Sequence, residues 1–264
     1  MEDQTSLVTT ERDGHVLLIG VNRAAKRNAF NLALIDQFAA AYEELGDDPE
    51  LRAAVVFGHG EHFSAGLDLA EVGPAVAKDG PAALGGGRRF DPFGMWGPQV
   101  PKPVVMAVQG IAFTLSIELA LASDIVIAAD DVRFRQLEIA RGIMPFGGAT
   151  VRAPMRLGWG NAMKFLLTGA QFGADEALRI GLVQEVVPAG EQVARAREIA
   201  TQIAAQAPLG VQATLANARI AEDQGITAAK EHLVAQLGAV LASKDAQEGV
   251  LSFIERRDAV FMGE

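Results

Sequence analysis

Short apolar runs along the first half of the chain predict buried strands, and the stretches between them favour helices. The strand-like runs are His15–Val21, Ala53–Phe57, Pro103–Val108 and Ile125–Ala128. Asn31 is a residue type that caps helix N-termini, and it begins a predicted helix that reaches about Leu45. Strand, helix and strand in succession indicate an α/β core.

The pattern after Gly147 is mainly helical. Predicted helices cover Asn161–Thr168, Ala174–Ile180, Glu191–Ala207, Pro208–Gln224 and Ile226–Leu241, and one short strand, Leu182–Val187, interrupts them. A last helix, about Asp245 to Arg257, carries Val250, Phe253 and Ile254 on one side. We expect this apolar side to dock on the same subunit or on a neighbouring one.

Residues 73–101 lose this periodicity and fill with Gly, Pro and Ala. Irregular segments of this length are typical of lids or binding loops, and a cluster of Phe90, Phe93, Met95 and Trp96 offers apolar surface for a ligand. The same cluster fits equally well as an anchor that holds the loop on the core. We therefore expect a long, mobile excursion here, with either role open.

Composition places the chain among globular proteins. Its 264 residues are 50% hydrophobic, which suffices to bury a substantial core in one large domain, with or without a short appendage. The formal net charge of −10 argues against nucleic acid or an anionic membrane as a partner. A local basic pocket for a small anion is compatible with that charge.

Several classes of site and location are excluded by what the sequence lacks. The chain has no Cys, so disulfides, a thiolate nucleophile and Cys-based zinc sites are excluded. The acidic segment Met1–Ser6 lacks the basic flank and apolar run of a signal peptide, and no segment reaches about 18 uninterrupted apolar residues. We therefore expect a soluble, cytoplasmic protein without a membrane partner.

Two glutamates stand in apolar surroundings. Glu118 lies inside the helix-like run from Gly110 to Asp124, and Glu138 ends the segment that begins at Phe134. A carboxylate buried among apolar residues loses hydration, so its pKa rises above the reference of about 4.3 and it becomes suited to moving protons near neutral pH. A Glu in a helix is more often solvated or capping, and the pattern alone leaves both interpretations open.

Four segments in order resemble the crotonase (enoyl-CoA hydratase/isomerase) superfamily. They are Val21–Ala29, Phe63–Leu69, Pro101–Asp124 and Phe134–Gly148, and together they span most of residues 15–190. The Phe63-Ser-Ala-Gly-Leu-Asp-Leu69 turn is the most specific, because it stands at the family's spacing from the later Pro-Lys-Pro-Val strand and the Glu118 helix. Each segment alone is weak, whereas the ordered set is a strong resemblance.

The resemblance implies an α/β fold, namely a crotonase-like spiral of repeated ββα turns with a C-terminal helical trimerisation region. We accordingly expect residues 1–195 to form the spiral core with the CoA site and the active site. Residues 196–264 are expected to form the helical region. The resemblance also implies a homotrimer, which in this family often pairs into a hexamer.

A coenzyme A thioester is the ligand that the resemblance implies, as part of the substrate and with no permanently bound cofactor. Its carbonyl oxygen would accept two backbone N–H bonds in an oxyanion hole, by position those of Leu67 and Leu115. Preformed amide dipoles, one of them at a helix N-terminus, stabilise an enolate-like oxygen without reorganising solvent.

Glu118 and Glu138 fall where hydratases of this family carry their catalytic glutamates. In that chemistry one carboxylate activates water for addition to Cβ of a trans-2-enoyl thioester, and the other supplies the proton to Cα. The resemblance implies the water for Glu118 and the Cα proton for Glu138. Both glutamates together favour an enoyl-CoA hydratase, because family isomerases commonly manage with one acid/base at the Glu138 position.

Contacts to CoA are implied at four further positions. Arg27 would lie near a CoA phosphate, although a simple surface charge explains this residue as well. Ala65 and Asp68 would line the path of the adenine and pantetheine through backbone contacts. Arg256 would stand where some relatives direct a Lys toward CoA.

The chain departs from the family next to Glu118. Many hydratases have a Gly-rich run there, whereas this chain has Phe113-Thr-Leu-Ser-Ile117. Because Gly lets backbone approach a ligand closely and adopt positive φ, Leu115 and Ser116 are expected to narrow or reshape the acyl site. The bulky Phe146 is expected to limit acyl size.

Other functions remain compatible with the sequence. Isomerisation of an enoyl-CoA, hydrolysis of an acyl-CoA and hydrolysis of a β-diketone without CoA all use the same enolate stabilisation. A non-catalytic acyl-CoA-binding subunit would keep the trimer without turnover, and the two glutamates argue against it. His59 and His62 have no third ligand at suitable spacing, so no metal is expected.

Overall fold

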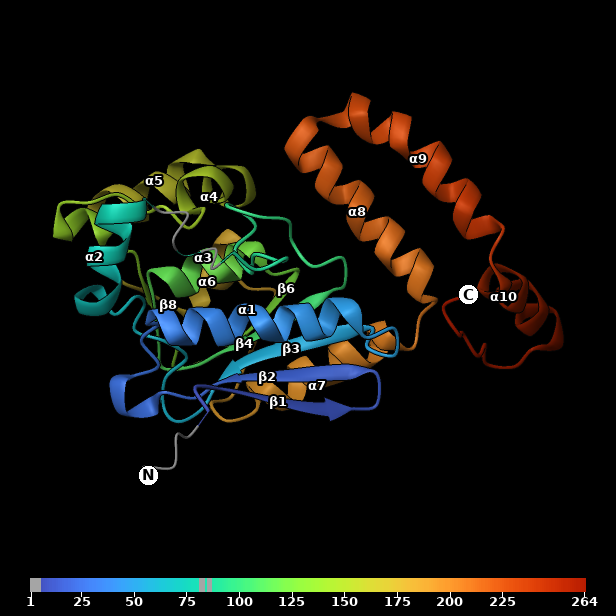
Figure 1. Cartoon of the computed structure of the whole chain (residues 1–264), viewed down its shortest axis with the longest axis horizontal. Helices are drawn as coiled ribbons and strands as arrows, with labels where there is room; N and C mark the ends of the chain where they lie inside the picture. Colours follow the sequence, from blue (N-terminus) through green and yellow to red (C-terminus); the bar gives the residue numbers. More distant parts are fainter. Residues whose placement is uncertain (1–5, 81–83, 85–86) are drawn as a thin grey trace.

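A six-stranded sheet forms the main layer of the computed structural model, which describes residues 6–80, 84 and 87–264 (Figure 1). Residues 1–5 of the N-terminal acidic segment, and residues 81–83 and 85–86 of the 73–101 segment, therefore lie outside the described residues. The strands are β1 (Val8–Asp13), β2 (Val16–Val21), β3 (Ala53–Gly58), β4 (Val104–Val108), β6 (Ile125–Ala129) and β9 (Glu185–Val187), in the order β1-β2-β3-β4-β6-β9. β1 pairs antiparallel with β2, and every later pair is parallel.

Both faces of this sheet are buried at the strands β2, β3, β4 and β6, which explains why these strands are continuous apolar runs. Alternate residues such as Val55, Val105 and Ile127 pack against the alanines of α7 (Gln192–Ala204). The intervening residues, Val56 and Met106 among them, belong to the larger core that includes α1 (Leu32–Asp47) and α3 (Leu115–Ala122). The sheet is thus the middle layer between α7 and the helices that carry the site.

A second sheet stacks successive turns of the chain. β5 (Ile111–Phe113) pairs parallel with β7 (Arg133–Arg135), which pairs antiparallel with β8 (Phe172–Gly173). Single bridges extend the same stacking to earlier turns, between Phe30 and Leu67 and between Ser64 and Ala112. Each turn therefore contributes one strand to the main sheet, a short strand or bridge to the second layer, and a helix.

The prediction of an irregular segment from Gly73 onward was wrong at its start. α2 (Leu69–Asp79) runs through Gly73 and Pro74, which had obscured its helical pattern. Farther along, the buried carboxylate of Asp91 accepts hydrogen bonds from the amides of Phe93, Met95 and Trp96 at 2.8 to 2.9 Å. Phe90 and Phe93 are buried in the core, so these two aromatic residues anchor the segment.

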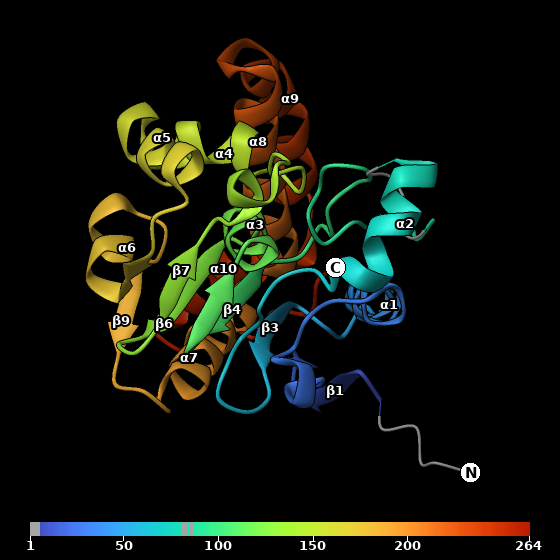
Figure 2. The same cartoon turned by 90° about the vertical axis from the view of Figure 1, so that its left-hand side faces the viewer.

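Four helices follow the second sheet or border it on the way to α7. They are α4 (Ala149–Leu157), α5 (Trp159–Thr168), α6 (Ala174–Ile180) and the short 3-10 helix η3 (Glu138–Arg141). Figure 2 shows α4 and α5 above the strands β6 and β7, with α2 on the opposite flank beside α1. The site described below lies between these two flanks.

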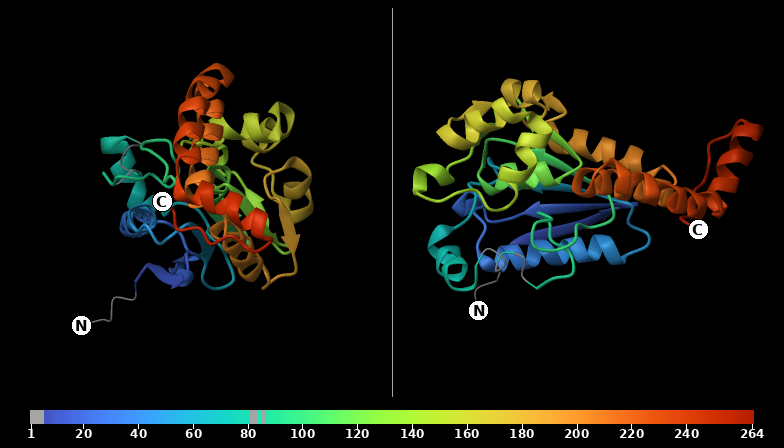
Figure 3. Two further views of the ribbon diagram at one scale, coloured as in Figure 1. Left: turned by 90° about the vertical axis from the view of Figure 1, so that its right-hand side faces the viewer. Right: turned by 90° about the horizontal axis from the view of Figure 1, so that it is seen from above.

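Beyond α7 the chain forms a helical hairpin that projects from the core (Figure 3). It consists of α8 (Pro208–Gln224) and α9 (Ile226–Leu241), and α10 (Lys244–Glu255) follows at the far end. Val250, Phe253 and Ile254 of α10 are 62%, 84% and 70% exposed, so this apolar side does not dock on its own chain. The expected boundary after residue 195 falls within α7. None of the described helices has the length and hydropathy needed to cross a membrane.

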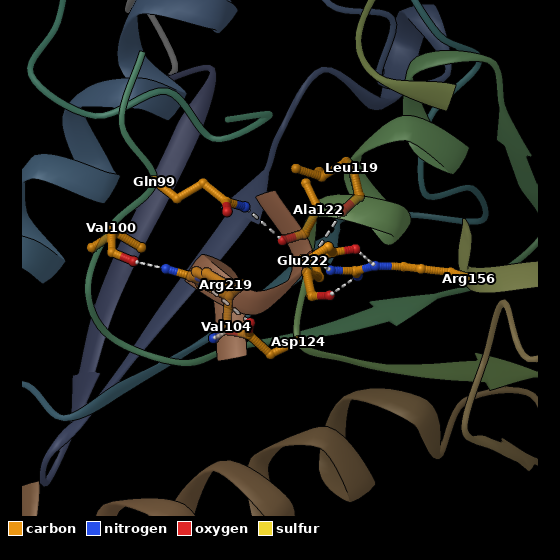
Figure 4. Close-up of polar contacts among 10 residues, drawn as sticks. Gln99, Val100, Val104, Leu119, Ala122, Asp124, Arg156, Arg219 and Glu222 are labelled. Atoms are coloured by element: carbon orange, nitrogen blue, oxygen red, sulfur yellow. Dashed lines mark hydrogen bonds and ion pairs between the residues drawn. The ribbon is translucent and has the colours of Figure 1, made fainter. Parts of the chain in front are cut away.

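The hairpin is fastened to the core through α8 (Figure 4). Arg219 donates to the carbonyl of Val100 at 2.7 Å and to the carboxylate of Asp124 at 3.2 Å. Three residues later on the same helix, Glu222 accepts two hydrogen bonds from Arg156 of α4, each 2.9 Å long. A bidentate guanidinium–carboxylate pair fixes orientation as well as distance, so α8 and α4 are held in one relative position.

Candidate active site

A cavity of about 170 Å³ lies where three segments of the spiral meet. The turn before α2 supplies one wall, the start of α3 a second, and η3 with the residues after it a third. The lining residues are Ala65, Leu67, Leu69, Thr114, Glu118, Leu137, Glu138, Arg141, Ile143 and Phe146. The two glutamates singled out by the sequence therefore share one cavity.

Glu118 lies one turn into α3 and is only 4% exposed. Its Oε1 accepts hydrogen bonds from the amides of Gly147 at 2.8 Å and Ala149 at 3.2 Å. Burial, and next the charge of Glu138, raise the pKa of Glu118 to about 7, although the two amides oppose the shift. A carboxyl group with this pKa exchanges protons readily at neutral pH.

Gly147 is required where the chain passes Glu118. A Cβ atom at this position would lie 2.4 Å from Oε2 of Glu118, well inside van der Waals contact. The absence of a side chain is therefore what lets the amide of Gly147 reach the carboxylate. Gly147 therefore contacts Glu118 directly, a role that the sequence had not disclosed.

Glu138 begins η3 and is 8% exposed. Its Oε1 accepts a hydrogen bond from Nε2 of Gln136 at 3.0 Å. Its Oε2 is buried and has no hydrogen-bond partner within the described part of the chain. Burial raises the pKa of Glu138, and the bond from Gln136 partly offsets the shift. An unpartnered buried carboxyl oxygen at a cavity wall is a position at which a ligand proton or a water can bind.

The two amides expected in the oxyanion hole carry no acceptor. Phe30 donates to the carbonyl of Gly66 and accepts from the amide of Asp68, so the intervening amide of Leu67 faces away from that bridge. Leu115 is the first residue of α3, where helical N–H groups have no acceptor in the preceding turn. Among the described residues, neither amide donates a hydrogen bond. Both are available to an oxygen in the cavity.

The residues implied for CoA do not all line one cavity. Ala65 lines the cavity, and its amide donates to the carbonyl of Arg27 at 2.9 Å. The side chain of Arg27 lines a separate pocket beside His59 and His62. The carboxylate of Asp68 is paired with Arg23 at 2.8 Å, which lowers the pKa of Asp68.

Arg256 is not brought to the cavity by its own chain. It follows the last turn of α10, whereas the cavity lies between α2 and α3 at the other end of the molecule (Figure 1). No group of three or more potential metal ligands occurs among the residues that the structure describes.

Sequence reasoning missed Thr114 and Gln136 and misjudged Ser116. Thr114 borders the cavity, whereas Ser116 is fully buried and donates to the carbonyl of Ser64 at 3.1 Å. The expectation that Ser116 reshapes the acyl site was therefore wrong, because its side chain is committed to the second layer of the spiral. The only signal for Gln136 in the sequence was that this polar residue stands two positions before Glu138.

The raised pKa of Glu118 predicts that Glu118→Gln stabilises the fold in alkaline but not in acidic solution. The folded protein binds the proton of Glu118 more tightly than the unfolded chain does, because an unperturbed Glu has a pKa of 4.5. Glu118 therefore does not reduce the unfolding free energy below pH 4.5. The reduction grows as the pH rises and reaches its full size above about pH 7. The variant should gain about 2–3 kcal/mol in unfolding free energy at pH 8 and almost none at pH 4.5.

Urea unfolding at both pH values and at one protein concentration measures this gain. The exposed Glu44 of α1 offers a control, and Glu44→Gln should leave the unfolding free energy unchanged at either pH. A gain for Glu118→Gln of the same size at pH 4.5 and pH 8 would contradict the prediction, because a packing effect has no such pH dependence.

Comparisons with known proteins identify the family of the chain. A model of the enoyl-CoA hydratase/isomerase family matches residues 11–264. Carnitinyl-CoA dehydratase of Escherichia coli is 35% identical over 257 residues, which cover 96% of this chain and 97% of that protein.

Solved structures extend the agreement to the fold. A probable enoyl-CoA hydratase/isomerase from Mycobacterium abscessus superposes with a TM-score of 0.94 at 50% identity, covering 98% of this chain and 99% of that one. An enoyl-CoA hydratase from Mycobacterium tuberculosis superposes with a TM-score of 0.88 at 32% identity, covering 98% and 100%. The crotonase fold expected from the sequence is confirmed. The chain belongs to the crotonase, or enoyl-CoA hydratase/isomerase, family.

Proposed function

We propose that this protein is an enoyl-CoA hydratase that adds water across the double bond of a trans-2-enoyl-CoA. The observation that carries the proposal is one cavity that holds two buried carboxyl groups, Glu118 and Glu138, beside two amides without acceptors. Members of this family act on CoA thioesters without a permanent cofactor. Hydration needs a base for water, an acid for carbon and a stabilised oxyanion, and the cavity offers each of them.

In the proposed reaction Glu118 takes a proton from water as the water oxygen bonds to Cβ. The electrons of the double bond move toward the thioester carbonyl, whose oxygen becomes an enolate held by the amides of Leu67 and Leu115. Glu138 then donates its proton to Cα and restores the carbonyl. Glu118 gains one proton from water, and Glu138 loses one proton to Cα. Transfer of a proton from Glu118 to Glu138 therefore restores the starting state.

Repulsion between the two carboxyl groups supports a reaction that uses one ionised and one protonated carboxyl group, whichever of the two holds the proton. Glu138 is among the causes that raise the pKa of Glu118, so ionising both groups together is unfavourable. Such a pair favours a state with a single proton, which belongs to the pair and not to one carboxyl group. One ionised and one protonated carboxyl group is the state that hydration requires.

The acyl group that we propose is a hydrocarbon chain. The cavity adjoins a larger pocket of about 900 Å³ that shares Leu67, Leu69, Ile143 and Phe146 with it. Its remaining lining comes mainly from apolar residues of α2 and of the η3–α4 connection. Carnitinyl-CoA carries a quaternary ammonium group, and among the described residues no carboxylate lines this larger pocket to compensate such a charge.

The test compares three substrates with the wild-type protein. Hydration of crotonyl-CoA and of a longer trans-2-enoyl-CoA is followed as loss of the absorbance of the conjugated thioester, and dehydration of carnitinyl-CoA as its appearance. Turnover of either enoyl-CoA above that of carnitinyl-CoA is expected. Binding of acyl-CoA without any hydration would instead point to isomerase or hydrolase chemistry, or to a binding-only subunit.

We also propose that the chain assembles as a homotrimer, alone or paired into a hexamer. Apolar side chains left exposed on α9 and α10, such as Val234 at 76% and Phe253 at 84%, support an interface in this region. We propose that CoA contacts Arg27, Ala65 and Asp68 of one subunit and Arg256 of a neighbouring subunit. Light scattering should give three or six times the chain mass of 27.8 kDa, and a monomer would contradict the assembly.

A further inference from the structure

We infer that the hydroxyl group of Thr114 is a third hydrogen-bond donor to the thioester oxygen, beside the amides of Leu67 and Leu115. The inference rests on the proposed function, because it assigns Thr114 to the same enolate. Thr114 immediately precedes α3 and borders the cavity together with Glu118 and Glu138. Three further observations lead to this role: its backbone conformation, its position between the two amides, and its lack of a hydrogen-bond partner.

The backbone of Thr114 adopts a conformation that its side chain disfavours. Its φ is +49° and its ψ is −109°, a region that glycine occupies freely and β-branched residues avoid. Such a residue persists only where the surrounding structure holds it, and strained residues gather at active sites. The strain directs attention to what the side chain does at this position.

The side chain of Thr114 lies between the two oxyanion-hole segments. A Cβ atom built on Gly66 would stand 1.9 Å from Oγ1 of Thr114, so the hydroxyl group rests directly against Gly66. The peptide group after Gly66 contains the amide of Leu67, and the peptide group after Thr114 contains the amide of Leu115. The hydroxyl group is therefore adjacent to both amides that the enolate oxygen would contact.

The hydroxyl group of Thr114 is uncommitted, unlike its neighbours. Ser64 donates to the carbonyl of Asn28 at 2.7 Å, and Ser116 donates to the carbonyl of Ser64 at 3.1 Å. Thr114 makes no side-chain hydrogen bond to any residue that the structure describes. A hydroxyl group at a cavity wall without a protein acceptor is free to donate to a ligand oxygen.

A third donor should act on the transition state more than on the bound substrate. The carbonyl oxygen gains negative charge as the enolate forms, so a preformed donor strengthens as the reaction proceeds. Removing the hydroxyl group is therefore expected to lower kcat with little change in KM. The two amides remain in place in such a variant, which limits the loss relative to removal of the whole oxyanion hole.

Thr114→Val tests the donor because valine keeps the shape and the β-branch. We expect kcat for hydration of crotonyl-CoA to fall about 10- to 100-fold, with KM within about threefold of wild type. Thr114→Ser, which keeps the hydroxyl group, should stay within about threefold of wild type in kcat. Thr150→Val, on the exposed face of α4, is the matched control and should have no effect.

Thr114→Gly separates the donor from the strain. Glycine accepts the backbone conformation freely, so this variant should unfold no more easily than wild type while losing as much kcat as Thr114→Val. If valine matches wild type, or if serine loses as much as valine, shape rather than donation explains the position and the inference is overturned.

A spectroscopic measurement keeps this test independent of turnover. A conjugated 2,4-dienoyl-CoA shifts its absorbance to longer wavelength when donors polarise its carbonyl group, and the shift should be smaller in Thr114→Val than in Thr114→Ser. A wild-type protein that polarises this probe but hydrates nothing would refute the hydratase proposal and leave the role of Thr114 measurable. Equal shifts in all variants would refute the third donor alone, and absence of any shift in wild type would refute both.

Discussion

Replacing Glu138 with Gln is expected to lower kcat for hydration of crotonyl-CoA by about 10³-fold. Gln can still accept the hydrogen bond that Gln136 donates to Glu138, so the fold around η3 should persist. What the variant loses is the proton for Cα. KM should change little, because the carboxyl group acts on the transition state more than on binding.

Glu118→Gln should lose activity by a similar factor for a different reason, since the variant cannot take a proton from water. The two variants can be told apart by exchange of the Cα protons of a saturated acyl-CoA with D2O. This exchange needs the acid/base at Cα, so it should survive in Glu118→Gln and disappear in Glu138→Gln. The double variant should be little worse than either single one, because both groups serve one reaction. Exchange lost in Glu118→Gln alone would reverse the assigned roles.

The second large effect is expected for Gly66→Ala. Gly66 has a φ of +99°, and an added methyl group would overlap Oγ1 of Thr114 at 1.9 Å and approach the carbonyl of Phe113 at 3.4 Å. Both the strained φ and the overlap push apart the segments that carry Leu67 and Leu115. We expect the unfolding free energy to fall by at least about 2 kcal/mol. We also expect kcat/KM to fall about 100-fold.

Gly160→Ala provides the matched control. Gly160 lies inside α5, away from both pockets, has an ordinary φ and has open space where a Cβ would stand. Alanine there should stabilise the helix by about 0.5–1 kcal/mol and leave the hydration kinetics unchanged. Chemical unfolding and steady-state kinetics on both variants decide the matter. Equal behaviour of the two alanine variants would mean that the separation of the two amides is not critical.

The sequence predicted helices best where local chemistry marks both ends. Pro208 begins α8, and Gly225, with a φ of +88°, separates α8 from α9, so both helices have the predicted bounds. β1 was missed because it is an edge strand with a mostly exposed, polar sequence. α2 was missed because a Gly-Pro pair interrupts its pattern although the helix continues through it.

Only the site residues whose type is unusual for their surroundings could be predicted from the sequence. Two glutamates in apolar segments were visible in the sequence, and so was the specific Ser-Ala-Gly-Leu-Asp turn. The bond from Gln136 to Glu138 and the contact between Thr114 and Gly66 were not, because each depends on the angle at which successive turns of the spiral stack. Thr114 in particular departs from local preference, and local rules fail most often at strained functional positions.

α4 connects the candidate active site to distant parts of the chain. Its first residue, Ala149, donates to Glu118; Arg152, one turn later, holds the carbonyls of Phe93 and Gly94; and Arg156 grips Glu222 of α8. All three residues belong to the nine-residue helix α4. A mutation in the C-terminal hairpin is therefore expected to affect Glu118, the proposed catalytic base, through α4, so homologues that differ in α8 should also differ in the pH at which they work.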